Sequence, residues 1–180
     1  MALTFLMNEE TYYMKPWDQS PRLPASVQKK FASLSGDAKL QAQIKYYILN
    51  EELVNLVRSI SEVGFSPLDF VHGIVQAGSI IVFDGARRLI ATLILRDPEL
   101  INRIDGCGDN SAEGQVLLEL YSQVLQIHFE THKNLISGLA SIPVMKYNPG
   151  VYSLAEASTD CFSKIEAGMK PQDFAEQAKS

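Results

Sequence analysis

Residues 79–95 read SIIVFDGARRLIATLIL, and this stretch predicts a strand, a turn and a helix in that order. Residues 80–83 form a short β-branched run of the buried-strand type, and a strongly apolar run of helical length follows Gly85. Glycine turns the chain where other residues would be strained, so Gly85 is the predicted turn between the two elements. We expect the helix to be central, because apolar residues cover most of its circumference.

Arg87 and Arg88 occupy the first turn of this predicted helix. A helix N-terminus carries partial positive charge and unpaired N–H groups, so two cations there are unfavourable unless a negative group lies nearby. That group is Asp84, a carboxylate from elsewhere in the fold, or a bound anion such as a phosphate. The alternative to ligand binding is a salt bridge from the arginines to Asp84 and to Glu51 or Glu62.

Length and composition favour one globular domain, since 180 residues with 46% hydrophobic content can bury a proper core. Cys107 and Cys161 are far apart, which indicates neither a disulfide framework nor a zinc knuckle and favours a reducing, cytoplasmic setting. The first ten residues lack the pattern of a signal peptide, and no apolar run approaches the roughly 20 residues that span a bilayer. We therefore expect no membrane role.

Charge is unevenly distributed along the chain, whose formal net charge is −5. Residues 15–45 carry six basic and two acidic side chains, a local balance of +4, whereas residues 46–180 carry ten basic and seventeen acidic ones. Any contact with a nucleic-acid backbone would therefore use the segment from Lys15 to Lys45. The alternative is an ordinary solvated surface.

The remaining elements follow from periodicity, caps and turn residues. Residues 1–37 predict an irregular N-terminal arm with a short helix at 25–34, and residues 38–180 predict the main domain. Within that domain we expect helices at 38–49 and 51–63, the second capped by Asn50 and ended by Gly64. We further expect a hairpin at 69–83, one long helix from about 111 to 137, a strand at 140–147 and a helix at 153–167.

His128 and His132 lie four residues apart on the predicted long helix, the spacing that places two metal ligands on one face. Glu130 does not directly follow the first histidine, as the metalloprotease pattern requires, and no third ligand is evident. The pair is therefore a weak metal candidate, and no metal is expected.

The order of motifs around Gly85 resembles the ParB/sulfiredoxin-like superfamily, in particular ParB-like N-terminal domains. The resemblance covers roughly residues 41–100. It comprises an Ile-x-x-x-Gly helix end at 60–64, a proline and apolar residue at 67–68, a glycine hairpin at Gly78, and the signature DGARRLIA at 84–91. A weaker match is the strand at 142–146 followed by a helix. The resemblance implies an α+β fold with a small mixed β-sheet flanked by helices, and makes residues 101–139 a helical insertion.

In ParB-type members the Gly-x-Arg-Arg segment holds a nucleotide triphosphate, usually that of CTP. The resemblance thus implies phosphate binding by Gly85, Ala86, Arg87 and Arg88. For Asp84 the preferred role is structural pairing, and the alternatives are that it orients an arginine or helps to hold a metal such as Mg²⁺ beside a phosphate. Ser66 and Pro67 occupy the positions expected on the base side of the nucleotide, which would be CTP or ATP. Carboxylates near the start of the second helix are catalytic in kinase-like relatives, which makes Glu51 a weak catalytic candidate.

The sequence departs from the family pattern at three places. No cysteine follows Gly85, so the sulfiredoxin thiol is absent; Ser66 replaces a glutamine associated with cytosine recognition; and residues 158–164 contain no counterpart of the second phosphate motif. The preferred function is a nucleotide-binding switch or adaptor in a DNA-linked process such as partition, plasmid or phage biology, or defence, with a protein partner or a homodimer. The alternatives are a structural or protein-interaction module with a degenerate ligand site, and a nucleotide-dependent kinase or weak nuclease.

Overall fold

The computed structural model describes residues 3–50, 52–66 and 68–179. Over these residues the chain forms α-helices and one open, mixed, five-stranded sheet, which confirms the predicted α+β class. Two compact units are present. The first comprises Met1–Pro16, Phe65–Leu89 and Ala140–Ser180, and the second comprises Trp17–Gly64 and Ile90–Leu139. Helix α4 (Ala86–Arg96) begins in the first unit and ends in the second.

The first unit contains the whole sheet, in the order β1-β5-β3-β4-β2. Its strands are β1 (Thr4–Glu10), β2 (Met14–Pro16), β3 (Val71–Gln76), β4 (Ser79–Asp84) and β5 (Ser141–Tyr147), with a short 3-10 helix η1 (Thr11–Tyr13) between the first two. β1 pairs antiparallel with β5, and β3 antiparallel with β4, whereas β3–β5 and β2–β4 are parallel. The hairpin predicted around residues 76–78 is therefore confirmed, because β3 and β4 are joined there.

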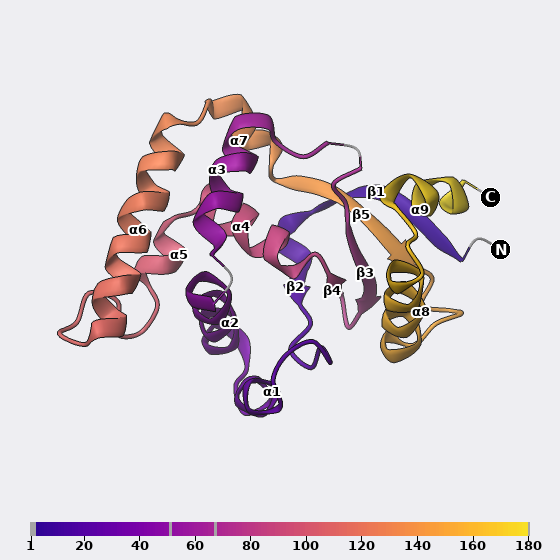
Figure 1. Ribbon diagram of the computed structural model, residues 1–180, viewed down its shortest axis with the longest axis horizontal. Helices are drawn as coiled ribbons and strands as arrows, with labels where there is room; N and C mark the ends of the chain where they lie inside the picture. The colour runs from indigo at the N-terminus through magenta and orange to yellow at the C-terminus, as the bar shows by residue number, and fades with distance from the viewer. Residues whose placement is uncertain (1–2, 51, 67, 180) are drawn as a thin grey trace. The chain divides into compact units, whose positions relative to one another are not determined.

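Helices α8 (Leu154–Glu166) and α9 (Pro171–Ala178) cover one face of this sheet (Figure 1). α8 packs on β3 and β4, and α9 packs on β1 and β5. Aromatic contacts join the helices to the sheet. The ring centroids of Phe83 and Phe162 lie 6.4 Å apart, and those of His72 and Phe174 lie 4.7 Å apart. Strand β5 and helix α8 match the predicted elements closely.

The second unit is helical. It contains α1 (Ala25–Ala32), α2 (Gly36–Asn50), α3 (Leu53–Val63), α5 (Glu99–Asn102), α6 (Ala112–Glu130), α7 (Lys133–Gly138) and the larger part of α4. α6 packs against α2, α3 and α5. Leu89, Ile90, Ala91, Ile94 and Leu95 of α4 are all fully buried, as expected for a central helix. None of the described helices has both the length and the apolar character needed to cross a bilayer.

The prediction of an irregular arm over residues 1–37 missed two strands. Thr4–Glu10 is paired along its full length with β5, and Met14–Pro16 is paired with β4. Four large apolar residues between Leu3 and Met7 are exposed, so the segment lacks the alternation that identifies a half-buried strand. The short helix predicted at 25–34 is confirmed as α1.

Two predicted helix boundaries were also wrong. Asn50 is the last residue of α2 rather than an N-cap, and its side-chain amide donates to the Tyr46 carbonyl at 2.8 Å. α3 is instead preceded by Glu52 in the left-handed conformation. The predicted long helix is interrupted after Glu130, where Thr131 and His132 are extended, and α7 begins at Lys133.

Candidate anion site at the junction of β4 and α4

Gly85 lies between β4 and α4 with a backbone φ of +87°, in the region that favours glycine. Its carbonyl accepts the Leu89 N–H at 3.0 Å, so the helix begins directly after it. A Cβ at this position would lie 2.8 Å from Cγ1 of Val71 on the neighbouring strand. The predicted strand, glycine turn and helix are therefore confirmed, and the close approach of β3 adds a second reason for glycine.

The two arginines of the first helical turn have different surroundings. Nη1 of Arg88 donates a hydrogen bond to the Phe70 carbonyl at 3.0 Å, and the Arg88 side chain is half-buried. Arg87 is exposed, as expected for consecutive helical residues, whose side chains point about 100° apart. Asp84, at the end of β4, and Ala86, at the first helical position, are both half-buried. The junction thus presents one anchored arginine and one arginine at the surface.

The loop before β3 is held by its own hydrogen bonds. The Ser66 N–H donates to Oδ2 of Asp69 at 3.2 Å, the Asp69 N–H donates to the Ser66 carbonyl at 3.0 Å, and the Leu68 N–H donates to Oγ of Ser66 at 3.2 Å. This turn leads directly to Phe70, the residue whose carbonyl accepts from Arg88. The predicted base-side residue Ser66 is therefore exposed in a loop whose end is tied to the start of α4. Its partner in that prediction, Pro67, lies outside the described residues.

The histidine pair does not have the predicted geometry. His128 lies in the last turn of α6, and its Nδ1 is 2.6 Å from the Leu95 carbonyl oxygen. His132 lies beyond the end of that helix, where its Nδ1 accepts the Asn134 N–H at 3.1 Å and caps α7. The break after Glu130 thus removes the shared helical face on which the metal prediction depended. Among the described residues, no group of three or more His, Cys, Asp or Glu side chains is arranged to hold a metal ion.

Glu51, the weak catalytic candidate, lies outside the described residues. Carboxylates with altered pKa values are found instead at helix ends and in side-chain pairs. The pKa of Glu99 is lowered chiefly because it accepts a hydrogen bond from the Tyr121 hydroxyl. The pKa of Asp109 is lowered mainly by hydrogen bonds from Ser111. Both arrangements are structural pairs within the second unit.

Sequence reasoning missed an open surface pocket of about 670 Å³ in the first unit. It is lined by Leu3, which precedes β1, by Val151 and Tyr152, which precede α8, and by Ala155, Glu156, Thr159 and Asp160 of α8. One lining residue, Asp160, accepts a hydrogen bond at 3.0 Å from the buried Tyr147 hydroxyl, and burial is the main cause that raises the pKa of Tyr147. Lys164 pairs with the same carboxylate at 2.9 Å. The residues of the β4–α4 junction do not line this pocket.

These residues define an α+β protein with an open mixed sheet and an arginine pair on the first turn of α4. Comparisons with protein-family models, with curated proteins and with solved structures gave no match for this chain.

Proposed function

We propose that this protein is a ParB/sulfiredoxin-like nucleotide-binding switch or adaptor, with the phosphates held at the junction of β4 and α4. The observation that carries the proposal is the surface position of Arg87 next to Arg88, whose guanidinium is anchored to the Phe70 carbonyl. Backbone N–H groups at the start of a helix add donors that favour an anion. The resemblance of residues 84–91 to the family signature is the reason for proposing that this anion is a nucleotide.

The chemistry of arginine is compatible with both anchoring and binding at this position. A guanidinium has five N–H donors in a planar fork, so one side chain can donate to a carbonyl and also contact a phosphate. The anchored Arg88 would approach the phosphate with little further loss of conformational freedom. Exposed Arg87 would close onto the ligand, and Asp84 would orient an arginine or share Mg²⁺ with the phosphates.

A structural role for the same residues is the competing proposal, favoured by the bond between Arg88 and Phe70. In that case Arg88 joins the loop before β3 to the start of α4, and the protein is a scaffold or protein-interaction module. The two proposals differ in what substitution of the arginines changes. If the arginines are purely structural, their substitution changes only the stability of the ligand-free protein, whereas arginines that bind the ligand are also needed for the stabilisation by nucleotide.

The test is a thermal-shift and calorimetric titration with CTP, ATP, GTP, ADP and inorganic triphosphate, each with Mg²⁺. A ligand at 100 times its Kd stabilises the folded state by about 2.7 kcal/mol, which gives a clear rise in melting temperature. Arg87→Ala is expected to abolish the rise. Arg58→Ala is the matched control, because Arg58 is another exposed helical arginine, on α3. Absence of a shift with every nucleotide and with triphosphate would reject the ligand and favour the scaffold.

Inorganic triphosphate separates phosphate binding from base recognition. Equal shifts with triphosphate and all nucleotides indicate a site that holds phosphates alone. Ser66→Gln, which places the family's glutamine at the base-side position, should then improve selectivity for CTP. Analysis of the same mixtures for released phosphate or a transferred phosphoryl group tests the enzyme alternative, a kinase-like or hydrolytic activity.

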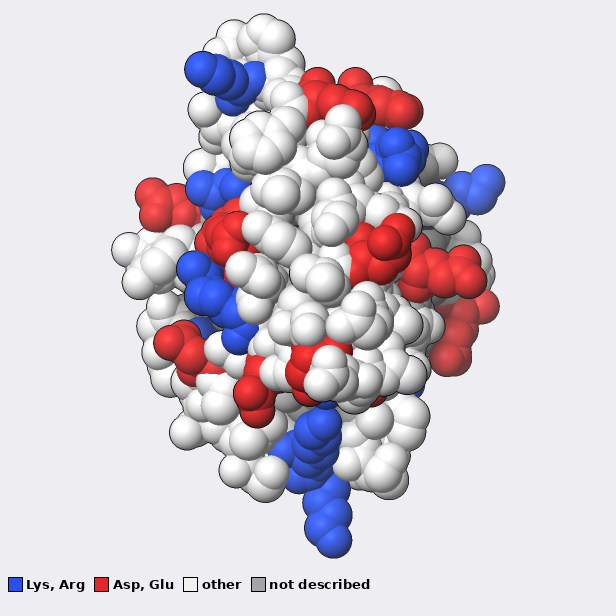
Figure 2. Space-filling model, turned by 90° about the vertical axis from the view of Figure 1, so that its left-hand side faces the viewer, with Lys and Arg blue, Asp and Glu red and all other residues white. Residues whose placement is uncertain are grey.

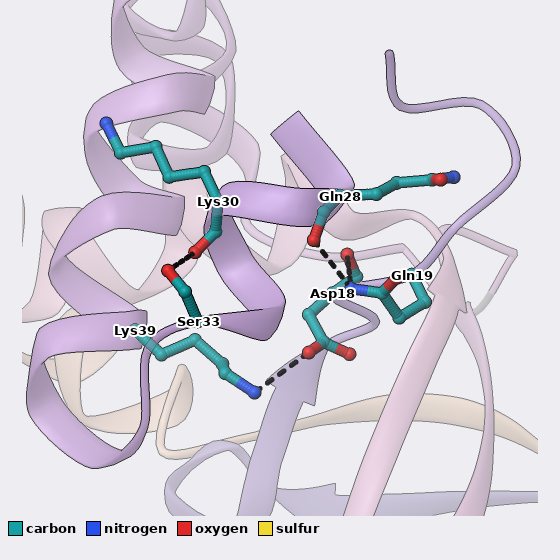
Figure 3. Close-up of polar contacts among 6 residues, drawn as sticks. All are labelled: Asp18, Gln19, Gln28, Lys30, Ser33 and Lys39. Atoms are coloured by element: carbon teal, nitrogen blue, oxygen red, sulfur yellow. Dashed lines mark hydrogen bonds and ion pairs between the residues drawn. The ribbon is translucent and has the colours of Figure 1, made fainter. Parts of the chain in front are cut away.

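A DNA-linked role would use the basic segment from Lys15 to Lys45. Within it, Lys39 pairs with Asp18 at 2.8 Å, and Lys45 pairs with Glu113. Figure 3 shows the Lys39 pair beside the hydrogen bonds that hold α1, with the Lys30 side chain extending away from Asp18. Figure 2 shows acidic and basic side chains interspersed on the side that carries α6. Contact would therefore use exposed basic side chains outside these two ion pairs, which include Lys29 and Lys30 on α1.

Binding of duplex DNA at two salt concentrations tests this role. Phosphate contacts release counterions, so the affinity must fall steeply as salt rises, and Lys29→Ala with Lys30→Ala must reduce that slope. Affinity that does not change with salt would reject the basic segment as a DNA contact.

A further inference from the structure

We propose that the outer edge of β1 is a homodimer interface, at which β1 of a second copy pairs antiparallel and continues the sheet. β1 is an edge strand in the order β1-β5-β3-β4-β2. An edge strand presents a row of backbone N–H and C=O groups that can pair with another strand.

The ladder between β1 and β5 determines the direction of each backbone group. The Asn148 N–H donates to the Leu3 carbonyl at 2.9 Å, and the Thr11 N–H donates to the Ala140 carbonyl at 2.9 Å. Hydrogen-bonded pairs alternate with non-hydrogen-bonded pairs in an antiparallel ladder, so the odd-numbered residues of β1 bond to β5. Pro143, which has no N–H, lies opposite Asn8, at a position where this ladder requires none. The even-numbered residues, Thr4, Leu6, Asn8 and Glu10, therefore direct their backbone groups outward.

The two edges of the sheet differ in their protection. β2 has only three residues and ends at Pro16, and short strands, lysine and proline are the usual means of blocking an edge. β1 has seven residues without proline, glycine, lysine or a bulge. Its apolar side chains are exposed on both faces, with Phe5, Leu6 and Met7 retaining between 38% and 48% of their surface. Only β1 has the length and the apolar surface of a pairing edge.

A second copy of β1 fits this edge in one register. Outward residues must face outward residues, which limits the pairing to alignments centred on a single residue of each strand. An alignment centred on Met7 pairs Thr4 with Glu10 of the second copy and Leu6 with Asn8 of the second copy, and the reverse pairs follow from the two-fold axis. All four outward residues then take part. Each pair of Leu6 with Asn8 forms two hydrogen bonds, and each pair of Thr4 with Glu10 forms one from the Glu10 N–H, because the Glu10 carbonyl accepts the first bond of η1. The total of about six lies within the range of about 5 to 15 hydrogen bonds in ordinary protein interfaces. Alignments centred on Leu6 or Asn8 use only three described outward residues per strand.

The charges on β1 are compatible with the same alignment. Glu9 would face Phe5 of the second copy, so the glutamates of the two copies lie at opposite ends of the paired strands, about 13 Å apart along the strand. In addition, Lys146 of β5 pairs with Glu9 at 2.8 Å, so the Glu9 carboxylate is held toward β5 and away from the outer edge. A parallel alignment would instead place like charges together, which is destabilising. Self-pairing is therefore antiparallel, with Met7 facing Met7 of the second copy on the axis.

The experiment is measurement of mass by light scattering and sedimentation over a range of protein concentrations. The expected result is a concentration-dependent dimer of the 20.0 kDa chain. Met7→Lys and Met7→Glu each place like charges opposite one another, so each should weaken dimerisation by at least about tenfold. An equimolar mixture of the two variants should recover the dimer as a heterodimer, because opposite charges then meet on the axis.

Asn8→Pro is an independent test, because it removes an outward N–H and leaves the bonds to β5 intact. Asn8→Ala is its matched control, since it removes the same exposed side chain and keeps the N–H. The proline variant should be monomeric and folded by circular dichroism, and the alanine variant should remain dimeric. A monomer at all concentrations overturns the proposal and leaves the edge to a strand from a different protein. A dimer that is unaffected by Met7→Lys and Asn8→Pro overturns it as well, because the interface then lies elsewhere.

Discussion

Replacement of Gly85 by alanine should destabilise the protein through two separable effects. The first is backbone strain, because a φ of +87° costs a residue with a side chain about 1–2 kcal/mol. The second is steric, since the new Cβ would lie 2.8 Å from Cγ1, 3.1 Å from Cβ and 3.3 Å from Cα of the fully buried Val71. Such overpacking typically costs about 1–3 kcal/mol. The expected loss in the free energy of unfolding is therefore about 2–5 kcal/mol.

Gly78→Ala is the matched control. Gly78 has a similar φ of +79°, but a Cβ added there would meet no atom within 4 Å beyond the adjacent residues of the chain. Its substitution should cost only the backbone strain of about 1–2 kcal/mol. Both variants are measured by urea unfolding followed by circular dichroism, with the slope of free energy against urea checked for a common value.

A double-mutant cycle with Val71→Ala isolates the steric effect. Removing Cγ1 relieves the shortest contact, so the double variant should be more stable than the sum of the two single losses predicts, by about 0.5–3 kcal/mol. Equal losses for Gly85→Ala and Gly78→Ala, or simple additivity in the cycle, would refute the assignment of a close approach between β3 and the start of α4.

Two further predictions concern the first unit. Glu156 and Ser153 form a capping box at the start of α8, and hydrogen bonds from the backbone and the side chain of Ser153 lower the Glu156 pKa below its ordinary value of 4.5. The stabilisation by the Glu156 carboxylate is therefore complete above pH 4.5 and is lost as the pH falls through the folded-state pKa. Glu156→Gln should reduce the free energy of unfolding at pH 7 and make the urea midpoint fall less steeply as the pH is lowered. Parallel curves of urea midpoint against pH for the two proteins would contradict this. Thr11 is fully buried, and its hydroxyl donates to the Ala140 carbonyl at 3.1 Å. Thr11→Val should therefore lower the free energy of unfolding by about 1 kcal/mol in the same assay. Unchanged stability would show that this hydrogen bond contributes nothing.

The sequence alone determined the elements whose signals are local. The glycine at 85, the apolar run after it and the capping serine at 153 each act within a few residues, and the corresponding turn and helices are present. It also placed Arg87 and Arg88 at a helix start. The sequence could not predict the anchoring of Arg88, because Phe70 lies eighteen residues away and becomes a neighbour only through the pairing of β3 with β4.

Tertiary structure decided the features that depend on distant partners. β1 is a strand because β5, more than 130 residues later, supplies its hydrogen bonds, and its exposed apolar residues give no period that local reasoning can detect. Phe129 lies well inside the long helix predicted from about 111 to 137, yet its side chain is 76% exposed and the helix ends one residue later. Local propensity determines which segments can be helix or strand. The position of β1 at the sheet edge, the break after Glu130 and the choice of which helix face is buried depend instead on which segments pack together.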